Sequence, residues 1–523
     1  MVANAVPSDT HLIILTSKDK LYLQKSSLKF TYKVFCLLLI FLIILSFGKL
    51  KLSEANLTSV KEVVGDTPIT LTFNDKKKTN GIVFLAHGFA GSTSFMRPIA
   101  VALAEAGFLT VRFDFLGHGR HPQPYSGDII TIAGATQKFV NQTNKIVSYY
   151  LAKNDHSFSM IIGHSMASDI IMRSALSDNR VNSAVAISAY TDALKSDRPK
   201  NVLILNGQWE PQLREKSLEI LKSTGIKNPE EGKIYGSLND DTIRKVEVIK
   251  NADHVGVLYS IRTQKELLDW INFLNRDKQV FISNNIGIWT GILFFSIFFL
   301  VIFLIKFLDQ NISKKHRLRY LRFFSINILA CVLSPLILYY FKINFVEFPA
   351  HNHLINQMIL ISIILSFSIP SAQIRELAKS FDFRLFAILF ILFCILFGSI
   401  LDSYVSSFLL AGIRVPIFFC CLLGTVPLMV LMQLYYDNYS NGWIVGNIFK
   451  LFLIISLSTS ILLEISQLFI VGYAIILFLA FALIFGFLAN MVSRKYNNTL
   501  SVGLANGITL AWTFSTALPL YVN

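Results

Sequence analysis

Long apolar runs occur in two parts of the chain and enclose a stretch of mixed character. The first run covers residues 34–48, which Leu50 can extend to an anchor of residues 34–50, and further runs follow one another from about residue 285 to residue 520. About 20 consecutive apolar residues are enough for a helix to cross a membrane. The pattern therefore predicts an N-terminal anchor, a folded domain over residues 51–280 and a multi-span membrane region over residues 281–523.

Within the folded domain, short apolar runs typical of buried strands alternate with stretches of helical periodicity. Helical patterns fit between the runs, for example over residues 95–106 and 137–151. Strands that alternate with helices form a mostly parallel sheet covered on both faces, so we expect an α/β fold. The strand-like runs cover residues 81–86, 109–114, 158–162, 184–187, 202–205 and 246–249.

The membrane region divides into about eight apolar segments, which with the anchor make about nine spans. The anchor is short for a span, and Ser46 and Gly48 near its end also allow a cleaved signal peptide. The long polar segment 1–33 before it favours an uncleaved anchor. The segments lie near residues 285–307, 324–342, 355–372, 385–401, 415–435, 443–463, 466–490 and 501–520.

Basic residues gather at the ends of these apolar runs. One group lies in residues 1–33, and later groups lie at residues 314–322, 375–384 and 494–495. Alternation of the spans puts every group on one side, which the positive-inside rule makes the cytoplasm. We therefore expect a multi-pass cell-membrane protein with a cytoplasmic N-terminus and an extracytoplasmic domain over residues 51–280.

Composition narrows the class of protein further. Hydrophobic residues make up 53% of the chain and charged residues 15%, which is unlike a soluble protein. The net charge of +15 is spread over the ends of apolar runs rather than one folded surface, so we expect no nucleic-acid binding. Residues 50–280 contain no cysteine, which excludes a disulfide framework or a thiolate metal site there.

One serine carries the pattern of a nucleophile elbow. An apolar strand leads into Gly163-His164-Ser165-Met166-Ala167, and helical sequence follows. The turn of an elbow is so tight that the residues two before and two after the serine must be small, as they are here. The flanking strand and helix argue against a chance match, so Ser165 is predicted to be a nucleophile.

An oxyanion hole is predicted from the end of another strand. The run at residues 81–86 ends in His87-Gly88, and such a loop supplies a backbone N–H to a developing oxyanion. We expect the donors to be the N–H groups of Phe89 and Met166.

Two later strand ends carry an acid and a base. Glu210 lies in the loop after the strand at 202–205, and His254 follows the strand at 246–249. The chain order Ser, Glu, His is that of α/β-hydrolase triads. Asp192, after the preceding strand, is the main rival acid, and Asp253 is too close to His254 in sequence to orient it easily.

Residues 81–275 resemble the α/β-hydrolase superfamily, in particular its branch of esterases, lysophospholipases and serine aminopeptidases. The resemblance implies that Ser165 is the nucleophile, His254 the general base and Glu210 its orienting acid, with no metal and no organic cofactor. Ala167 in place of the commoner Gly, and Glu210 in place of the commoner Asp, leave this chemistry intact. The resemblance covers well under half of the chain, and we match the membrane region to no family. It rests on His87-Gly88, Asp114 to Gly119, Gly163 to Ala167, Gly207 to Glu210 and Asp253-His254.

Little sequence is available to cap this site. Only residues 188–201 separate the two strands between which many relatives insert a helical cap. We expect the site to be open, or to be covered by residues 228–241 or by the membrane region. Either arrangement would suit a bulky or lipid-borne acyl group.

These features favour an esterase or lipase-like serine hydrolase that acts on an acyl-bearing small molecule or lipid. An acyltransferase with a membrane-borne acceptor is the nearest alternative. A transporter or sensor with a non-catalytic ectodomain is a distant one, since such a protein need not retain Ser165, His254 and an acid. Polar residues of the membrane region are expected to be structural or interfacial, and two histidines without other ligands are weak evidence for a metal site. They are Arg414, Glu464, His351 and His353.

Overall fold

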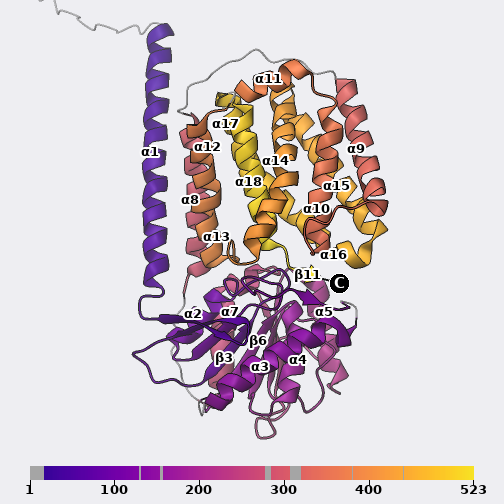
Figure 1. Cartoon of the computed structure of the whole chain (residues 1–523). Helices are drawn as coiled ribbons and strands as arrows, with labels where there is room; N and C mark the ends of the chain where they lie inside the picture. Colours follow the sequence, from indigo (N-terminus) through magenta and orange to yellow (C-terminus); the bar gives the residue numbers. More distant parts are fainter. Residues whose placement is uncertain are drawn as a thin grey trace, which may run out of the picture.

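The computed structural model shows an α/β domain below a bundle of helices, with the long helix α1 (Ser17–Leu52) standing beside the bundle (Figure 1). Rings of α1 pack on Phe303 of the bundle, with centroids 5.6 Å away for Tyr32 and 5.5 Å away for Phe35. The structure describes residues 17–128, 131–153, 157–276, 284–306, 320–379, 381–439, 441–496 and 498–522.

A nine-stranded sheet forms the centre of the α/β domain, in the order β1-β2-β4-β3-β6-β7-β8-β10-β9. The strands from β4 to β10 are parallel to one another, while β2 is antiparallel to both its neighbours and β9 is antiparallel to β10. Every predicted strand overlaps one of the parallel strands, which confirms the predicted fold class. The strands are β1 (Thr58–Val64), β2 (Thr67–Phe73), β3 (Ile82–Ala86), β4 (Leu109–Phe113), β6 (Ser159–His164), β7 (Ser183–Ile187), β8 (Val202–Gly207), β9 (Ile234–Tyr235) and β10 (Arg244–Ile249).

Helices cover both faces of this sheet because successive strand side chains point to opposite faces. Phe84 of β3 packs with residues of α3 and α4, whereas Val83 and Leu85 pack with residues of α2 and α7. On the second face, Trp270 also donates a hydrogen bond of 2.9 Å to Ser183 of β7. The helices are α2 (Arg97–Glu105), the π-helical turn η1 (Ile132–Thr136), α3 (Gln137–Lys153), α4 (Met166–Ser177), α5 (Pro211–Ser223), α6 (Gly256–Tyr259) and α7 (Ile261–Asn275).

The bundle has a helical segment in each of the ranges predicted for spans. Three of the predicted spans are bent or interrupted. Helices α10 and α11 meet at 116°, and the π-helical turns η2 and η3 each lie within a longer helical segment. The elements are α8 (Ile286–Lys306), α9 (Tyr320–Tyr340), α10 (Pro349–Ser366), α11 (Ser371–Lys379), α12 (Phe383–Phe390), η2 (Ile391–Phe397), α13 (Gly398–Tyr404), α14 (Arg414–Asn438), α15 (Gly442–Leu463), α16 (Ile465–Phe481), η3 (Ala482–Gly486), α17 (Phe487–Tyr496) and α18 (Thr499–Ala517).

Among the described residues, seven helices are long and apolar enough to cross a membrane, or eight if α10 and α11 form one span. The sequence predicted about nine. The helix that differs is α18, which is rich in small and polar residues and packs along α14. Gly503 and Gly507 make this packing close, since an added Cβ would lie 2.8 Å from Val430 and 2.6 Å from Val426. Small residues four apart allow such an approach between helices.

The bundle and the α/β domain share a polar interface. Arg120 forms an ion pair of 2.6 Å with Asp402, which lies at the end of α13. The N–H of Ser407 donates to the hydroxyl of Ser92 at 2.9 Å, and the hydroxyl of Tyr259 donates to the carbonyl of Tyr404 at 2.7 Å. The interface fixes α13 and the loop after it against the α/β domain.

A short two-stranded sheet also joins the two parts. Strand β11 (Tyr521–Val522), which follows α18, pairs in parallel with β5 (Tyr125–Ser126) of the α/β domain. The buried guanidinium of Arg414 donates to the carbonyls of Ser515 and Gly117, at 3.0 Å and 3.1 Å, and so ties α14 to both. This is the structural role that the sequence predicted for Arg414.

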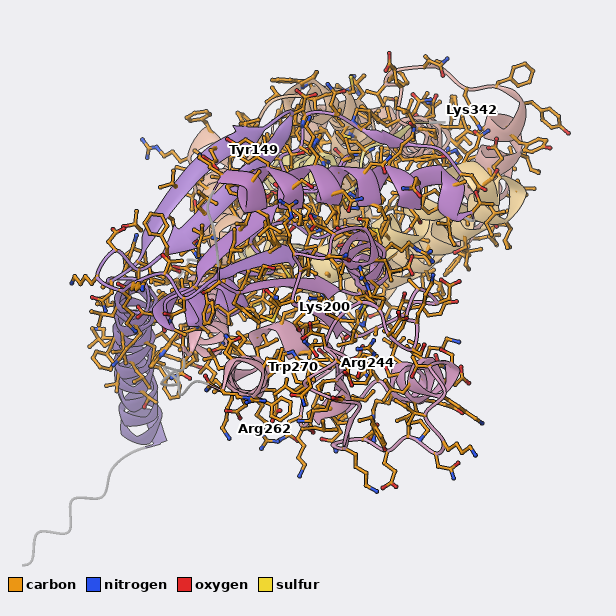
Figure 2. The ribbon with its side chains drawn as sticks, turned by 90° about the horizontal axis from the view of Figure 1, so that it is seen from below. Tyr149, Lys200, Arg244, Arg262, Trp270 and Lys342 are labelled. Carbon is orange, nitrogen blue, oxygen red and sulfur yellow. The ribbon has the colours of Figure 1, made fainter. Side chains whose placement is uncertain are left out.

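The described basic residues of the predicted groups after residue 300 belong to α9, α11, α12 and α17, which have ends at the end of the bundle away from the α/β domain (Figure 1). Lys49 and Lys51 in the last turn of α1, and Arg414 at the start of α14, lie at the other end. Seen from below, α1 and Lys342, in the loop after α9, lie at opposite edges of the molecule (Figure 2). Basic residues 314–319 lie outside the described residues, and so do residues 1–16, whereas the lysines of the predicted group at 1–33 lie on α1, from Lys18 to Lys33. Which side of a membrane this end faces stays a prediction. The described residues in question are Arg322, Arg375, Lys379, Arg384, Arg494 and Lys495.

Candidate active site

Ser165 lies on a sharp turn between β6 and α4. Its backbone angles are φ 53° and ψ −118°, a strained conformation that residues other than glycine rarely adopt. A Cβ added at Gly163 would lie 2.5 Å from the carbonyl oxygen of Ala167. This close approach explains why the residue two before the serine is glycine. The geometry is that of a nucleophile elbow.

The close packing at the elbow predicts how far one added methyl group, in Gly163→Ala, destabilises the protein. Gly163→Ala is expected to lower the stability of the protein by about 1–3 kcal/mol, because the new Cβ meets backbone that cannot move aside. The measurement is the melting temperature of the full-length protein in detergent. Gly48→Ala is the matched control, since nothing lies within 4 Å of a Cβ built there. Equal melting temperatures for the two variants would contradict the prediction.

The structure brings Ser165, His254 and Glu210 into one hydrogen-bonded line. The Ser165 Oγ lies 2.9 Å from His254 Nε2, and His254 Nδ1 lies 2.6 Å from Glu210 Oε1. The three residues follow β6, β10 and β8, so they come from the carboxyl ends of parallel strands, where the sequence expected them.

Glu210 is held by more than the histidine. Its Oε2 accepts hydrogen bonds from the N–H of Gly207 at 2.6 Å and from the hydroxyl of Ser188 at 2.8 Å. Burial alone would raise the pKa of Glu210, but the hydrogen bonds from His254, Gly207 and Ser188 outweigh it and hold the pKa below its usual value. The side chain is therefore an ionised carboxylate that faces His254.

His164, the residue before the serine, supports the base. Its Nε2 lies 2.8 Å from the carbonyl oxygen of His254 and donates to it. Burial, together with the nearby His254, lowers the pKa of His164 to about 4, so its ring is neutral near pH 7. The sequence reasoning missed His164 and Ser188. Their position at the ends of β6 and β7 was the available signal.

The two rival acids have other partners. Asp192 pairs with Arg173, and its side chain is 78% exposed. Asp253 accepts hydrogen bonds from the N–H groups of Val255 and Gly256, and so closes the turn that follows it. Of the three acids considered, Glu210 is the one that contacts the ring of His254.

The two predicted oxyanion donors lie beside the serine. An added Cβ at Gly88 would be 3.0 Å from the Cβ of Ser165, so the loop after β3 passes close to the nucleophile. Phe89 and Met166 both line the same cavity as Ser165. Met166 is the first residue of α4, where a backbone N–H has no acceptor within its own helix. Their role as donors stays a prediction.

The cavity at Ser165 has a volume of about 740 Å³ and is lined by both apolar and charged side chains. The charged residues of the lining are Asp169, Arg173, Asp192 and Lys216. Its apolar and aromatic residues include Phe89, Tyr125, Ile132, Ala135, Phe139, Met166, Ile170 and Phe469.

One of these lining residues comes from the helical bundle. Phe469 lies on α16, and its ring centroid is 6.4 Å from that of Phe89. No residue of 228–241, a segment that the structure describes in full, lines the cavity. Of the two covers that the sequence allowed, the bundle is therefore the one that contributes to the cavity.

Fold and site together define the class. A mostly parallel sheet, with a nucleophile elbow after one strand and a histidine after a later one, is the α/β-hydrolase fold. Within this class, residues 77–282 match the family described as serine aminopeptidase, S33. The match supports a hydrolase-family function for this part of the chain.

Three solved structures illustrate the similarity. A bacterial membrane phospholipase A is 16% identical, with 49% of this chain and 97% of that chain covered and a TM-score of 0.31. A soluble variant of monoglyceride lipase from Saccharomyces cerevisiae is 14% identical, with 42% and 93% covered and a TM-score of 0.29. A carboxylesterase from Bacillus subtilis is 11% identical, with 44% and 98% covered and a TM-score of 0.29. A comparison with curated proteins finds no match.

Proposed function

We propose that this protein is a membrane-bound serine hydrolase that cleaves an ester bond of an acyl-bearing small molecule or lipid. The observation that supports this most directly is the hydrogen-bonded line from Ser165 through His254 to Glu210. Distances of 2.9 Å and 2.6 Å are those that a nucleophile, its base and an orienting acid require.

In the proposed reaction, the Ser165 Oγ attacks the ester carbonyl carbon while its proton passes to His254 Nε2. The tetrahedral intermediate expels the alcohol, which takes the proton from His254 and leaves an acyl group on Ser165. Water then attacks the acyl-enzyme and gives a proton to His254, and that proton returns to Ser165 as the carboxylic acid leaves. The Glu210 carboxylate holds the tautomer of His254 and stabilises its cation.

The negative oxygen of each tetrahedral intermediate needs donors, and the N–H groups of Phe89 and Met166 are proposed for this role. Both residues line the cavity beside Ser165. The positive end of α4 adds to the stabilisation, since α4 begins at Met166. Each such donor is typically worth around 3 kcal/mol in the transition state.

The proposed organisation is a cytoplasmic segment 1–33, an anchor at 34–50, an extracytoplasmic hydrolase domain at 51–280 and a membrane region at 281–523. Seven apolar helices among the described residues support membrane association. The described basic residues at the opposite end of the bundle from the α/β domain support the cytoplasmic assignment of that end.

A membrane-impermeant fluorophosphonate probe tests both parts of the proposal on intact cells. Wild-type protein is expected to be labelled, and Ser165→Ala is expected to be unlabelled at equal expression. Equal labelling of the two would overturn the enzyme assignment. Labelling of the wild type only after the membrane is opened would overturn the topology instead.

Hydrolysis and acyl transfer share every step up to the acyl-enzyme. Release of free carboxylic acid by purified protein, unchanged when an alcohol or lysolipid acceptor is added, identifies a hydrolase. An acylated acceptor formed in preference to free acid would instead identify a transferase.

A further inference from the structure

The cavity at Ser165 is bounded by a continuous group of aromatic rings that links the bundle to the α/β domain. Phe89 lies 6.2 Å from Tyr473 and 6.4 Å from Phe469, between ring centroids. Phe469 lies 5.6 Å from Tyr521 of β11, and Tyr521 lies 5.1 Å from Tyr125 of β5. The bundle and β11 thus support one wall of the cavity.

This wall is aromatic, and the lining of the cavity also includes charged side chains. Arg173 lies 2.7 Å from Asp169 and also pairs with Asp192, and Thr191 donates to Asp169 at 2.7 Å. Ser165 lines the cavity together with both sets of residues. A substrate that suits both sets of residues has an apolar part and a polar part joined near the ester.

The wall also lies at the end of a helix that is apolar enough to cross a membrane. Phe469 is the fifth residue of α16, which begins at Ile465, so it lies about 6 Å along the helix axis from that end. The candidate span that contains it covers Ile465–Tyr496. The aromatic wall of the cavity therefore lies where the hydrolase domain meets the end of that span.

We propose that α16 is part of the acyl-binding site, and that Phe469 contacts the chain of a long-chain acyl ester whose carbonyl lies at Ser165. The polar leaving group then lies toward Arg173 and Asp192. This inference rests on the proposed hydrolase function and adds a substrate class and a role for the membrane region. A soluble domain without α16 would lack this contact.

The first test measures chain-length preference in full-length protein in detergent. Wild-type kcat/KM is expected to rise from butyryl to dodecanoyl esters of one alcohol. The ratio of dodecanoyl to butyryl kcat/KM is expected to fall about tenfold in Phe469→Ser and less in Phe469→Leu, because apolar contact with the chain is lost. Phe487→Ala is the matched control, since Phe487 is 47% exposed on α17 and is not part of the cavity lining. Its ratio is expected to equal that of the wild type.

The second test needs no substitution. A long-chain alkyl fluorophosphonate with a diazirine at the chain end is attached to wild-type Ser165, irradiated, and mapped by peptide mass spectrometry. Cross-links are expected within α16, residues Ile465–Phe481. The wild-type kcat/KM for the dodecanoyl ester is then compared between ester supplied in vesicles and ester supplied in solution. A higher value in vesicles indicates a membrane-borne substrate, and a higher value in solution indicates a soluble one.

The outcomes separate the two proposals. Hydrolysis of butyryl esters with no rise toward longer chains, or cross-links confined to the α/β domain, would overturn the role of α16 and leave the hydrolase function standing. Absence of both ester hydrolysis and probe attachment in the wild type would overturn the proposed function itself.

Discussion

Ser165→Ala is expected to lower kcat for ester hydrolysis on the order of 10⁶-fold. The hydroxyl of Ser165, 2.9 Å from His254, is the group proposed to form the acyl-enzyme, and alanine has no atom that can replace it. The fold should survive, because the substitution removes one oxygen at a turn whose backbone is fixed by its neighbours. The measurement is turnover of a short chromogenic ester by purified full-length protein.

Ser174→Ala is the matched control for this experiment. Ser174 lies on the same helix α4, its hydroxyl is buried, and that hydroxyl has no hydrogen-bond partner among the described residues. Turnover by Ser174→Ala is expected to equal that of the wild type. If Ser165→Ala retained more than about a hundredth of wild-type turnover, with the same melting temperature, Ser165 would not be the nucleophile.

Glu210→Gln is expected to lower kcat by roughly 10⁴-fold while the protein stays folded. The glutamine keeps the size of the side chain, but it is uncharged and can turn its NH₂ group toward His254 Nδ1. Nδ1 then accepts a hydrogen bond instead of donating one, which leaves the imidazole in the wrong tautomer. The structural basis is the 2.6 Å contact between His254 Nδ1 and Glu210 Oε1. The measurement is kcat and KM for the same short ester.

Two further variants make this second prediction specific. Glu231→Gln removes a carboxylate that pairs with Arg214 in the same domain, and its turnover is expected to match the wild type. Asp192→Asn tests the rival acid. A loss for Asp192→Asn as large as that for Glu210→Gln would contradict the assignment of Glu210.

The same glutamate predicts a pH dependence of stability. Because the folded protein holds the pKa of Glu210 below its usual value, the ionised carboxylate contributes stability that is fully present above that usual value, about 4.3. This contribution is lost as the pH falls through the lower folded-state pKa. The free energy of unfolding of the wild type is therefore expected to fall relative to that of Glu210→Gln between pH 7 and pH 3. A difference that stays constant over this range would contradict the prediction.

The sequence predicted those parts of the structure that a local pattern specifies. The six parallel strands that were predicted are short runs of apolar residues, and each is almost entirely buried or packs beside a buried neighbour. The residues proposed for catalysis follow such strands directly, so their relative order was enough to expect them at one edge of the sheet. Apolar runs likewise located the helices of the bundle.

Elements that depend on contacts with distant parts of the chain were not predicted. Strand β1 is mostly exposed and has no apolar alternation, so nothing in its own sequence sets it apart from a loop. Strand β11 has two residues and exists through its pairing with β5. Phe469 is one of many aromatic residues in apolar runs, and its place in the cavity depends on how α16 packs against the α/β domain.

The pairing of β5 with β11 also has a consequence for the order of synthesis. Tyr125 and Ser126 precede Tyr521 and Val522 by about 400 residues, so at 5–20 residues per second they leave the ribosome roughly 20–80 s earlier. During that interval the hydrolase domain exists without β11, whose Tyr521 packs on Tyr125 and Phe469 of the cavity lining, while the helices between β5 and β11 are still being made. The cavity therefore lacks Phe469 of its lining until α16 has been translated, and the support of Tyr521 until β11 has been translated.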